Sequence, residues 1–220
     1  MAVRTSVPAH RAHKPLLRGW LHTGAFVAAI PAGIVLVVVA PGAAARAAAI
    51  VYWVTLMAQF GVSALYHRGD WGEVWQARMR LFDHSTIFLL IAGTYTPFCA
   101  VALHGATSLV VLAIVWTGAA VGIGTKLYRV DLHVLSAFLY IGLGWTAVVV
   151  LPAMARSMSP TGFALVLAGG VVYTLGAIVL ATHKPDPWPH TFGYHEVWHT
   201  ATIAAAACLY TSILLLYLSG

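Results

Sequence analysis

The sequence predicts an all-α membrane protein, a polytopic bundle of seven transmembrane helices. Of its 220 residues, 60% are hydrophobic and only 8% are charged, and the mean hydropathy is +0.85. Soluble domains carry about 25% charged residues, so this chain has too few polar side chains to cover a water-facing surface. Seven long apolar stretches and a one-sided distribution of Lys and Arg support the same fold class.

Each apolar stretch is long enough to cross a hydrocarbon core of about 30 Å as a helix. The connections between the stretches are short, which leaves little chain for a catalytic domain outside the bilayer. We therefore expect one membrane domain over residues 18–220, preceded by a basic tail over residues 1–17. The expected spans are 18–39, 45–66, 82–103, 107–126, 133–151, 160–181 and 195–218.

The twelve Lys and Arg residues predict the orientation of the bundle. Ten of them precede the first span or follow the second, fourth and sixth spans, whereas only Arg46 and Arg156 lie in the alternate loops. Cytoplasmic loops are enriched in basic residues, so we expect a cytoplasmic N-terminus, an outer C-terminus and a place in the cell membrane. The same distribution accounts for the net charge of +6 without a nucleic-acid partner.

The spans carry few other signals of special structure. The first follows basic residues, as a signal peptide would, but Trp20–Val39 exceeds an h-region of about 7–15 residues, so we expect it to be retained. Pro31 and Pro97 predict kinks in the first and third spans. Gly118 and Gly122 in the fourth span have the small-xxx-small spacing that favours close helix packing.

Histidines concentrate at the expected cytoplasmic side, where ten of the eleven fall. His195 and His199 are four residues apart at the start of the seventh span, so both imidazoles lie on one helical face, one turn apart. Two nitrogens at this spacing can bind a single metal ion. The second span runs from outside to inside and ends at His67, which reaches the same depth. The sequence therefore predicts a site of three converging histidines.

Asp83 and Ser63 are expected at the same depth. A carboxylate in an apolar segment is costly and is by default a functional candidate. Ser63 lies one turn before His67, where its hydroxyl can bond Asp83, a ligand or a bound water, although a small residue there also suits close helix packing. Three neutral nitrogens plus one water are typical of catalytic zinc, with Asp83 as the general base.

The segment from His195 to His199 also matches the His-Glu-x-x-His signature of zinc proteases, in which the glutamate is the base. No His, Asp or Glu follows His199, so the third ligand has to come from upstream, as His67 can provide. Glu196 is adjacent to His195 around the helix and should point away from a site that both histidines face. We therefore rank Asp83 above Glu196 as the base.

At these residues the chain resembles the hemolysin III family, the bacterial branch of the progestin and adipoQ receptor family that includes the adiponectin receptors. The resemblance covers essentially the whole chain. It rests on four ordered motifs, which are Arg18-Gly-Trp-Leu-His22, Ser63-Ala-Leu-Tyr-His67, Phe82-Asp-His-Ser-Thr-Ile-Phe-Leu-Leu-Ile-Ala-Gly-Thr-Tyr-Thr-Pro-Phe98 and Phe192-Gly-Tyr-His-Glu-Val-Trp-His199.

The resemblance implies seven helices with the N-terminus inside and a zinc ion near the cytoplasmic face. Carried over residue by residue, it makes His67, His195 and His199 the zinc ligands and places Asp83 and Ser63 around the bound water. The family is also similar to a wider set of membrane hydrolases that includes alkaline ceramidases. That similarity implies a membrane lipid, such as a ceramide-like amide, as the substrate.

Other functions remain open at the level of sequence. One alternative is a membrane sensor or regulator in which structural zinc, with Asp83 as fourth ligand, ties three helices together. A cytolysin is less favoured because a secreted pore-former must stay soluble before insertion, and a channel is less favoured because charged residues are rare at mid-depth. His22 could line the site or anchor the interface, and His84 could line it or face away, so neither is in the core set.

Overall fold

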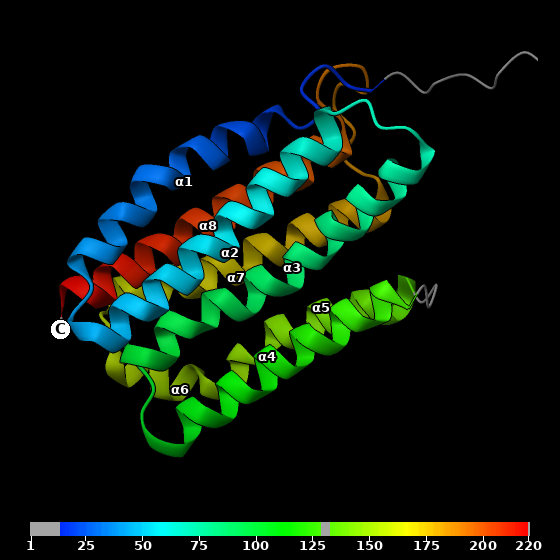
Figure 1. Cartoon of the computed structure of the whole chain (residues 1–220). Helices are drawn as coiled ribbons and strands as arrows, with labels where there is room; N and C mark the ends of the chain where they lie inside the picture. Colours follow the sequence, from blue (N-terminus) through cyan, green and yellow to red (C-terminus); the bar gives the residue numbers. More distant parts are fainter. Residues whose placement is uncertain (1–13, 129–132, 220) are drawn as a thin grey trace, which may run out of the picture.

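The computed structural model describes residues 14–128 and 133–219, and the side chains of all of these except residues 133–138. Most of the expected basic tail, and Arg129, lie outside the described residues. The described chain forms a bundle of elongated helices (Figure 1). The helices are α1 (Trp20–Val39), α2 (Gly42–Arg68), α3 (Glu73–Val101), α4 (Gly105–Leu127), α5 (His133–Trp145), α6 (Ala147–Ser157), α7 (Pro160–Thr182) and α8 (Tyr194–Leu218).

The seven-span architecture predicted from the sequence is confirmed. Seven helical stretches are long and apolar enough to cross a membrane, with α6 and the end of α5 forming one of them, Leu139–Ser157. Large apolar side chains cover much of the outer surface, Val38, Val149 and Leu109 among them at 70–82% exposure. Such a surface suits lipid and would be unstable in water.

Two span boundaries were wrong. Helix α3 begins at Glu73, well before the expected residue 82, because its first turns carry Gln76, Arg78 and Arg80 and continue the helix past the apolar segment. A prediction from hydropathy finds the apolar part of a helix and does not include polar helical turns that precede it. The expected fifth span, 133–151, is two helices that meet at Thr146, and the second of them continues through Pro152 to Ser157.

Helix order explains how distant segments reach one site. Helix α2 packs between α1 and α3, α4 packs on α3, and α8 packs on α7 and also returns to α1 and α3. The buried core lies between these helices and includes Leu36, Tyr52, Phe88, Val115 and Ile213, each below 2% exposure. The end of α2, the early turns of α3 and the start of α8 consequently meet at one end of the bundle (Figure 1).

Small residues and hydroxyl groups fix the packing of the helices. A Cβ on Gly33 would lie 2.0 Å from the Trp53 ring, and one on Gly122 would lie 2.4 Å from Phe88, so both positions need glycine for close approach. Gly118 likewise faces Leu143, which supports the packing role expected for this glycine pair. Tyrosine hydroxyls add bonds between helices, such as Tyr217 donating to the Ala45 carbonyl at 2.8 Å.

Candidate metal centre

The start of α8 is held by acidic groups that cap its free backbone N–H groups. The Tyr194 N–H donates to Asp186 Oδ1 at 2.8 Å, and the Gly193 N–H donates to Glu196 Oε2 at 2.9 Å. Negative charge at a helix N-terminus satisfies orphan donors and interacts favourably with the helix dipole. These caps fix the turn that carries His195 and, one turn later, His199.

Three histidines from two helices converge at this point. His67 from the last turn of α2 and His195 and His199 from α8 each offer a ring nitrogen, and these nitrogens all lie within 4.8 Å of one another. The Nε2 atoms of His67 and His195 are 3.2 Å apart. The structure therefore brings together the three histidines that the sequence predicted to converge.

The spacing of one nitrogen pair matches that of two ligands on a tetrahedral metal ion. Two imidazole nitrogens at about 2.0–2.1 Å from one tetrahedral zinc lie about 3.3 Å apart, close to the distance between His67 and His195. An N–H···N hydrogen bond gives a similar distance for one pair, so the case for a metal rests also on the third ring, His199, whose nitrogen lies within 4.8 Å of the other two. Neutral imidazole also suits other divalent metals.

Asp83 adds a carboxylate at the edge of the three-histidine cluster. Its Oδ2 lies 4.0 Å from His67 Nε2, while its Oδ1 is buried and has no hydrogen-bond partner within the described part of the chain. The hydroxyl of Ser63, 1% exposed on α2, is a polar neighbour of this carboxylate. A buried carboxylate oxygen without a partner requires a ligand, a water or an ion to compensate it. The arrangement leaves a free acceptor beside three ring nitrogens.

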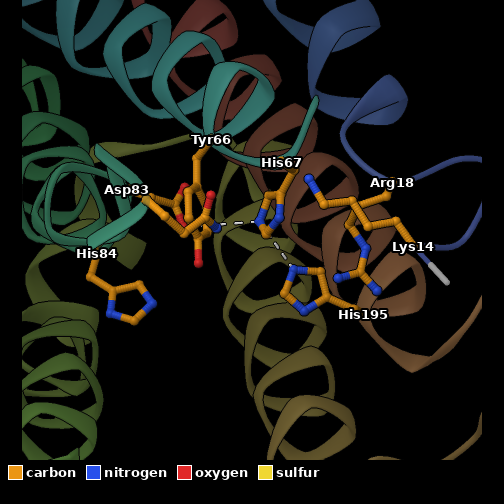
Figure 2. A pocket seen from close by; sticks show the side chains of 8 residues that line it. Lys14, Arg18, Tyr66, His67, Asp83, His84 and His195 are labelled. Atoms are coloured by element: carbon orange, nitrogen blue, oxygen red, sulfur yellow. Dashed lines mark hydrogen bonds and ion pairs between the residues drawn. The ribbon is translucent and has the colours of Figure 1, made fainter. Parts of the chain in front are cut away.

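A cavity of about 220 Å³ opens on this cluster. Figure 2 shows His67 between Asp83 and His195, with Arg18 and Lys14 on one side and the His84 ring farther off on the other. The cavity is lined by Lys14, Arg18, Tyr66, His67, Gln76, Asp83, His84 and His195. His84 thus lines the cavity with Asp83, which was one of the two placements left open for it.

Glu196 does not belong to the polar lining of this cavity. It is 2% exposed, and besides capping α8 it forms an ion pair with Arg18. Its carboxylate is therefore committed to holding the start of α8 and the segment before α1. This placement agrees with the ranking of Asp83 above Glu196 as the candidate base.

The sequence left the placement of His22 open and missed the part of Lys14 and Arg18 in the cavity lining. His22 is 2% exposed rather than an interfacial anchor, its ring stacks on His199 with centroids 3.9 Å apart, and its Nε2 lies 3.2 Å from Thr202 Oγ1. The signal for it was an ionisable side chain within a span. In the sequence, Lys14 and Arg18 are two of several basic residues before the first span. The fold brings both to the cavity.

The fold and the site together define a class of protein. The chain is a multi-pass helical membrane protein that carries a polar cavity, with three histidines and an aspartate, at one end of its bundle. This site chemistry is compatible with binding a metal ion and moving a proton beside it.

Comparison with known proteins places the chain more closely. The family model described as haemolysin-III related matches residues 10–210. Hemolysin-3 of Bacillus cereus is 34% identical over 192 residues, which cover 86% of this chain and 84% of that protein. The human monocyte to macrophage differentiation factor is 26% identical over 171 residues, 74% of this chain and 67% of that protein. The chain belongs to the haemolysin III family.

Proposed function

We propose that the chain is a zinc-dependent hydrolase of a membrane lipid amide, with His67, His195 and His199 as the zinc ligands. The observation that carries the proposal is the convergence of three ring nitrogens within 4.8 Å beside a buried carboxylate oxygen that has no partner among the described residues. Structural zinc sites are usually closed by four protein ligands. Three histidines leave a position for water and substrate.

Each residue of the site has a defined part in amide hydrolysis. When bound, zinc supplies Lewis acidity, which activates water and polarises the acyl carbonyl. Asp83 accepts the proton of the attacking water and returns it to the nitrogen of the leaving amine as the carbon–nitrogen bond breaks. Ser63 orients the Asp83 carboxylate, and His22 holds the His199 ring by stacking.

The dimensions and surroundings of the cavity support a lipid substrate. A volume of 220 Å³ is below the range of about 300–1,000 Å³ typical of sites that enclose a whole ligand. The cavity therefore suits the polar part of a lipid whose chains stay in the bilayer. We further propose that the site faces the cytoplasm in the cell membrane, on residues 18–220 as one membrane domain, because basic residues concentrate at this end.

The direct test is release of fatty acid from a ceramide by the zinc-loaded, detergent-purified protein. We expect wild type to release it and Asp83→Asn, which keeps the shape but not the basicity, to lose at least about 100-fold, the lower end of a general base's contribution. Asp70→Asn, in an exposed turn, is the matched control. No release of fatty acid from ceramide or other N-acyl lipids by zinc-loaded wild type would contradict the proposal.

A specific distance supports one second candidate, a non-catalytic regulator with structural zinc. Asp83 Oδ2 is 4.0 Å from His67 Nε2, near enough for Asp83 to serve as a fourth ligand after a small side-chain movement. In that case Asp83→Ala weakens zinc binding sharply. Retained zinc with lost hydrolysis in the same variant supports the enzyme instead. The haemolysin name of the relatives favours no third candidate, because the seven apolar spans suit a protein inserted where it is made.

A further inference from the structure

We propose that the cavity takes a lipid whose head group carries a phosphate, and that Lys14 binds this phosphate. The inference deepens the proposed hydrolase function and rests on it, because it names the substrate class of the same site. It is carried by the juxtaposition of Lys14 and the Asp83–histidine cluster in one small cavity at the end of the bundle.

Lys14 is a cation of the cavity lining that forms no ion pair within the described residues. Asp83 is the one carboxylate among the eight lining residues, whereas Lys14 and Arg18 both contribute cations. The charge of Arg18 is compensated by its ion pair with Glu196. Lys14 Nζ donates to the Gly69 carbonyl at 3.2 Å, and no carboxylate within residues 14–128 and 139–219 forms an ion pair with it. The Lys14 ammonium therefore has N–H donors and an uncompensated positive charge with which to bind an anion.

The surroundings of Lys14 place it at the depth of lipid head groups. Leu16, Trp20 and Trp75, near the same end of the bundle, are 73%, 52% and 53% exposed. Tryptophan collects at the boundary between acyl chains and water. Lys14 is itself exposed and lies two residues before Leu16, and lysine is a common phosphate ligand that acts as a point charge. The position favours the phosphate of a lipid over a dissolved anion.

The size of the cavity links the phosphate to the reacting group. A space of 220 Å³ is only a few atoms across, so a phosphate on Lys14 and an amide beside Asp83 have to belong to one short head group. A head group with its phosphate a few bonds from the amide nitrogen places the phosphate at Lys14 and the amide at Asp83 together. A neutral sphingoid base would leave the spare Lys14 donors to water.

The test measures binding of an amphiphile that contains no amide, so it is independent of turnover. Fluorescently labelled dodecyl phosphate and labelled dodecanol are titrated into zinc-loaded protein in uncharged detergent micelles, with zinc content checked for every variant. We expect wild type to bind the phosphate about tenfold more tightly than the alcohol, as one charge-assisted contact provides. Lys14→Gln should remove this preference, Lys14→Arg should keep most of it, and Lys184→Gln, in an exposed loop, should match wild type.

Two results would overturn the inference. Equal binding of phosphate and alcohol by wild type, or a preference that survives in Lys14→Gln, shows that Lys14 does not select phosphate. Displacement of dodecyl phosphate by inorganic phosphate at equal concentration shows that the ligand is a dissolved anion and not a lipid. Lys14-dependent binding without any ceramide or N-acyl lipid hydrolysis leaves phosphate binding by Lys14 standing and removes the hydrolase function.

Discussion

Arg18 forms an ion pair with Glu196, and this contact joins the segment before α1 to the first turn of α8. The Glu196 side chain is 2% exposed and that of Arg18 is 21% exposed. Beside the pair, backbone N–H groups of Leu16 and Leu17 donate to the carbonyls of His190 and Thr191 at 3.0 and 3.1 Å. The helix that carries two of the three histidines is thus anchored to the N-terminal segment.

The two partners of this ion pair should respond differently to neutralisation. Arg18→Gln leaves a buried carboxylate without its cation, so we expect a loss of about 3 kcal/mol in the free energy of unfolding. Glu196→Gln keeps an acceptor for the Gly193 N–H and leaves an arginine that reaches water, so we expect a loss of about 1 kcal/mol. Denaturant unfolding in detergent measures both. The double variant should resemble Glu196→Gln alone, and simple additivity would argue against the pairing.

His22 should act on the metal site through the ring of His199. Because the two rings stack at 3.9 Å, His22→Phe keeps the stack and should preserve zinc affinity, whereas His22→Ala should lower it about tenfold. Competition with a chromophoric chelator measures the zinc affinity. His104→Ala, between the end of α3 and the start of α4 and away from the histidine cluster, is the control. An equal loss in both His22 variants would mean that a His22 nitrogen, rather than the stack, is required.

The glycines of α1 provide a matched pair for testing the helix packing. A Cβ on Gly33 meets the Trp53 ring at 2.0 Å, whereas one on Gly24 meets nothing within 4 Å. Gly33→Ala should therefore cost about 1–3 kcal/mol through overpacking, while Gly24→Ala should be neutral or gain up to about 1 kcal/mol from helix propensity. Thermal unfolding in detergent compares them. Equal behaviour of the two variants would contradict the contact between α1 and α2.

The proposed orientation predicts which loops face the cytoplasm. In a chain with Cys99 and Cys208 replaced by Ala, Ser157→Cys and His190→Cys place single thiols at exposed positions on either side of α7. We expect a membrane-impermeant maleimide to label Ser157→Cys in intact cells and His190→Cys only after permeabilisation. The reverse pattern would invert the topology and place the cavity outside.

The length of the apolar stretches was enough to predict the seven spans, because a bilayer of fixed thickness demands about 20 apolar residues for each crossing. Depth along the bundle then brought His67 level with His195 and His199 without any knowledge of packing. The early start of α3 was missed because polar helical turns beyond the hydrocarbon look like a loop to hydropathy. The division between α5 and α6 at Thr146 was also missed, although Gly142 and Gly144 lie just before it, because glycine within a membrane span also serves close helix packing.

The lateral positions of the site residues could not be predicted in the same way. Whether His22 faced lipid or the interior depended on how α1 rotates against α8, and only the structure shows the stack on His199. Lys14 and Arg18 reach the cavity because their segment pairs with residues 190 and 191, a contact between distant parts of the chain. Depth is encoded in hydropathy, whereas rotation and long-range loop contacts depend on side-chain packing.

The central claim is that three histidines hold one zinc ion, and elemental analysis of the detergent-purified protein tests it most directly. We expect about one zinc per chain in wild type, a loss of zinc in His67→Ala and in His195→Ala, and retention in Asp83→Ala. His183→Ala, in the exposed loop after α7, should keep the wild-type content. Wild type purified without chelators that holds no zinc, or a His67→Ala variant that holds as much as wild type, would contradict the account.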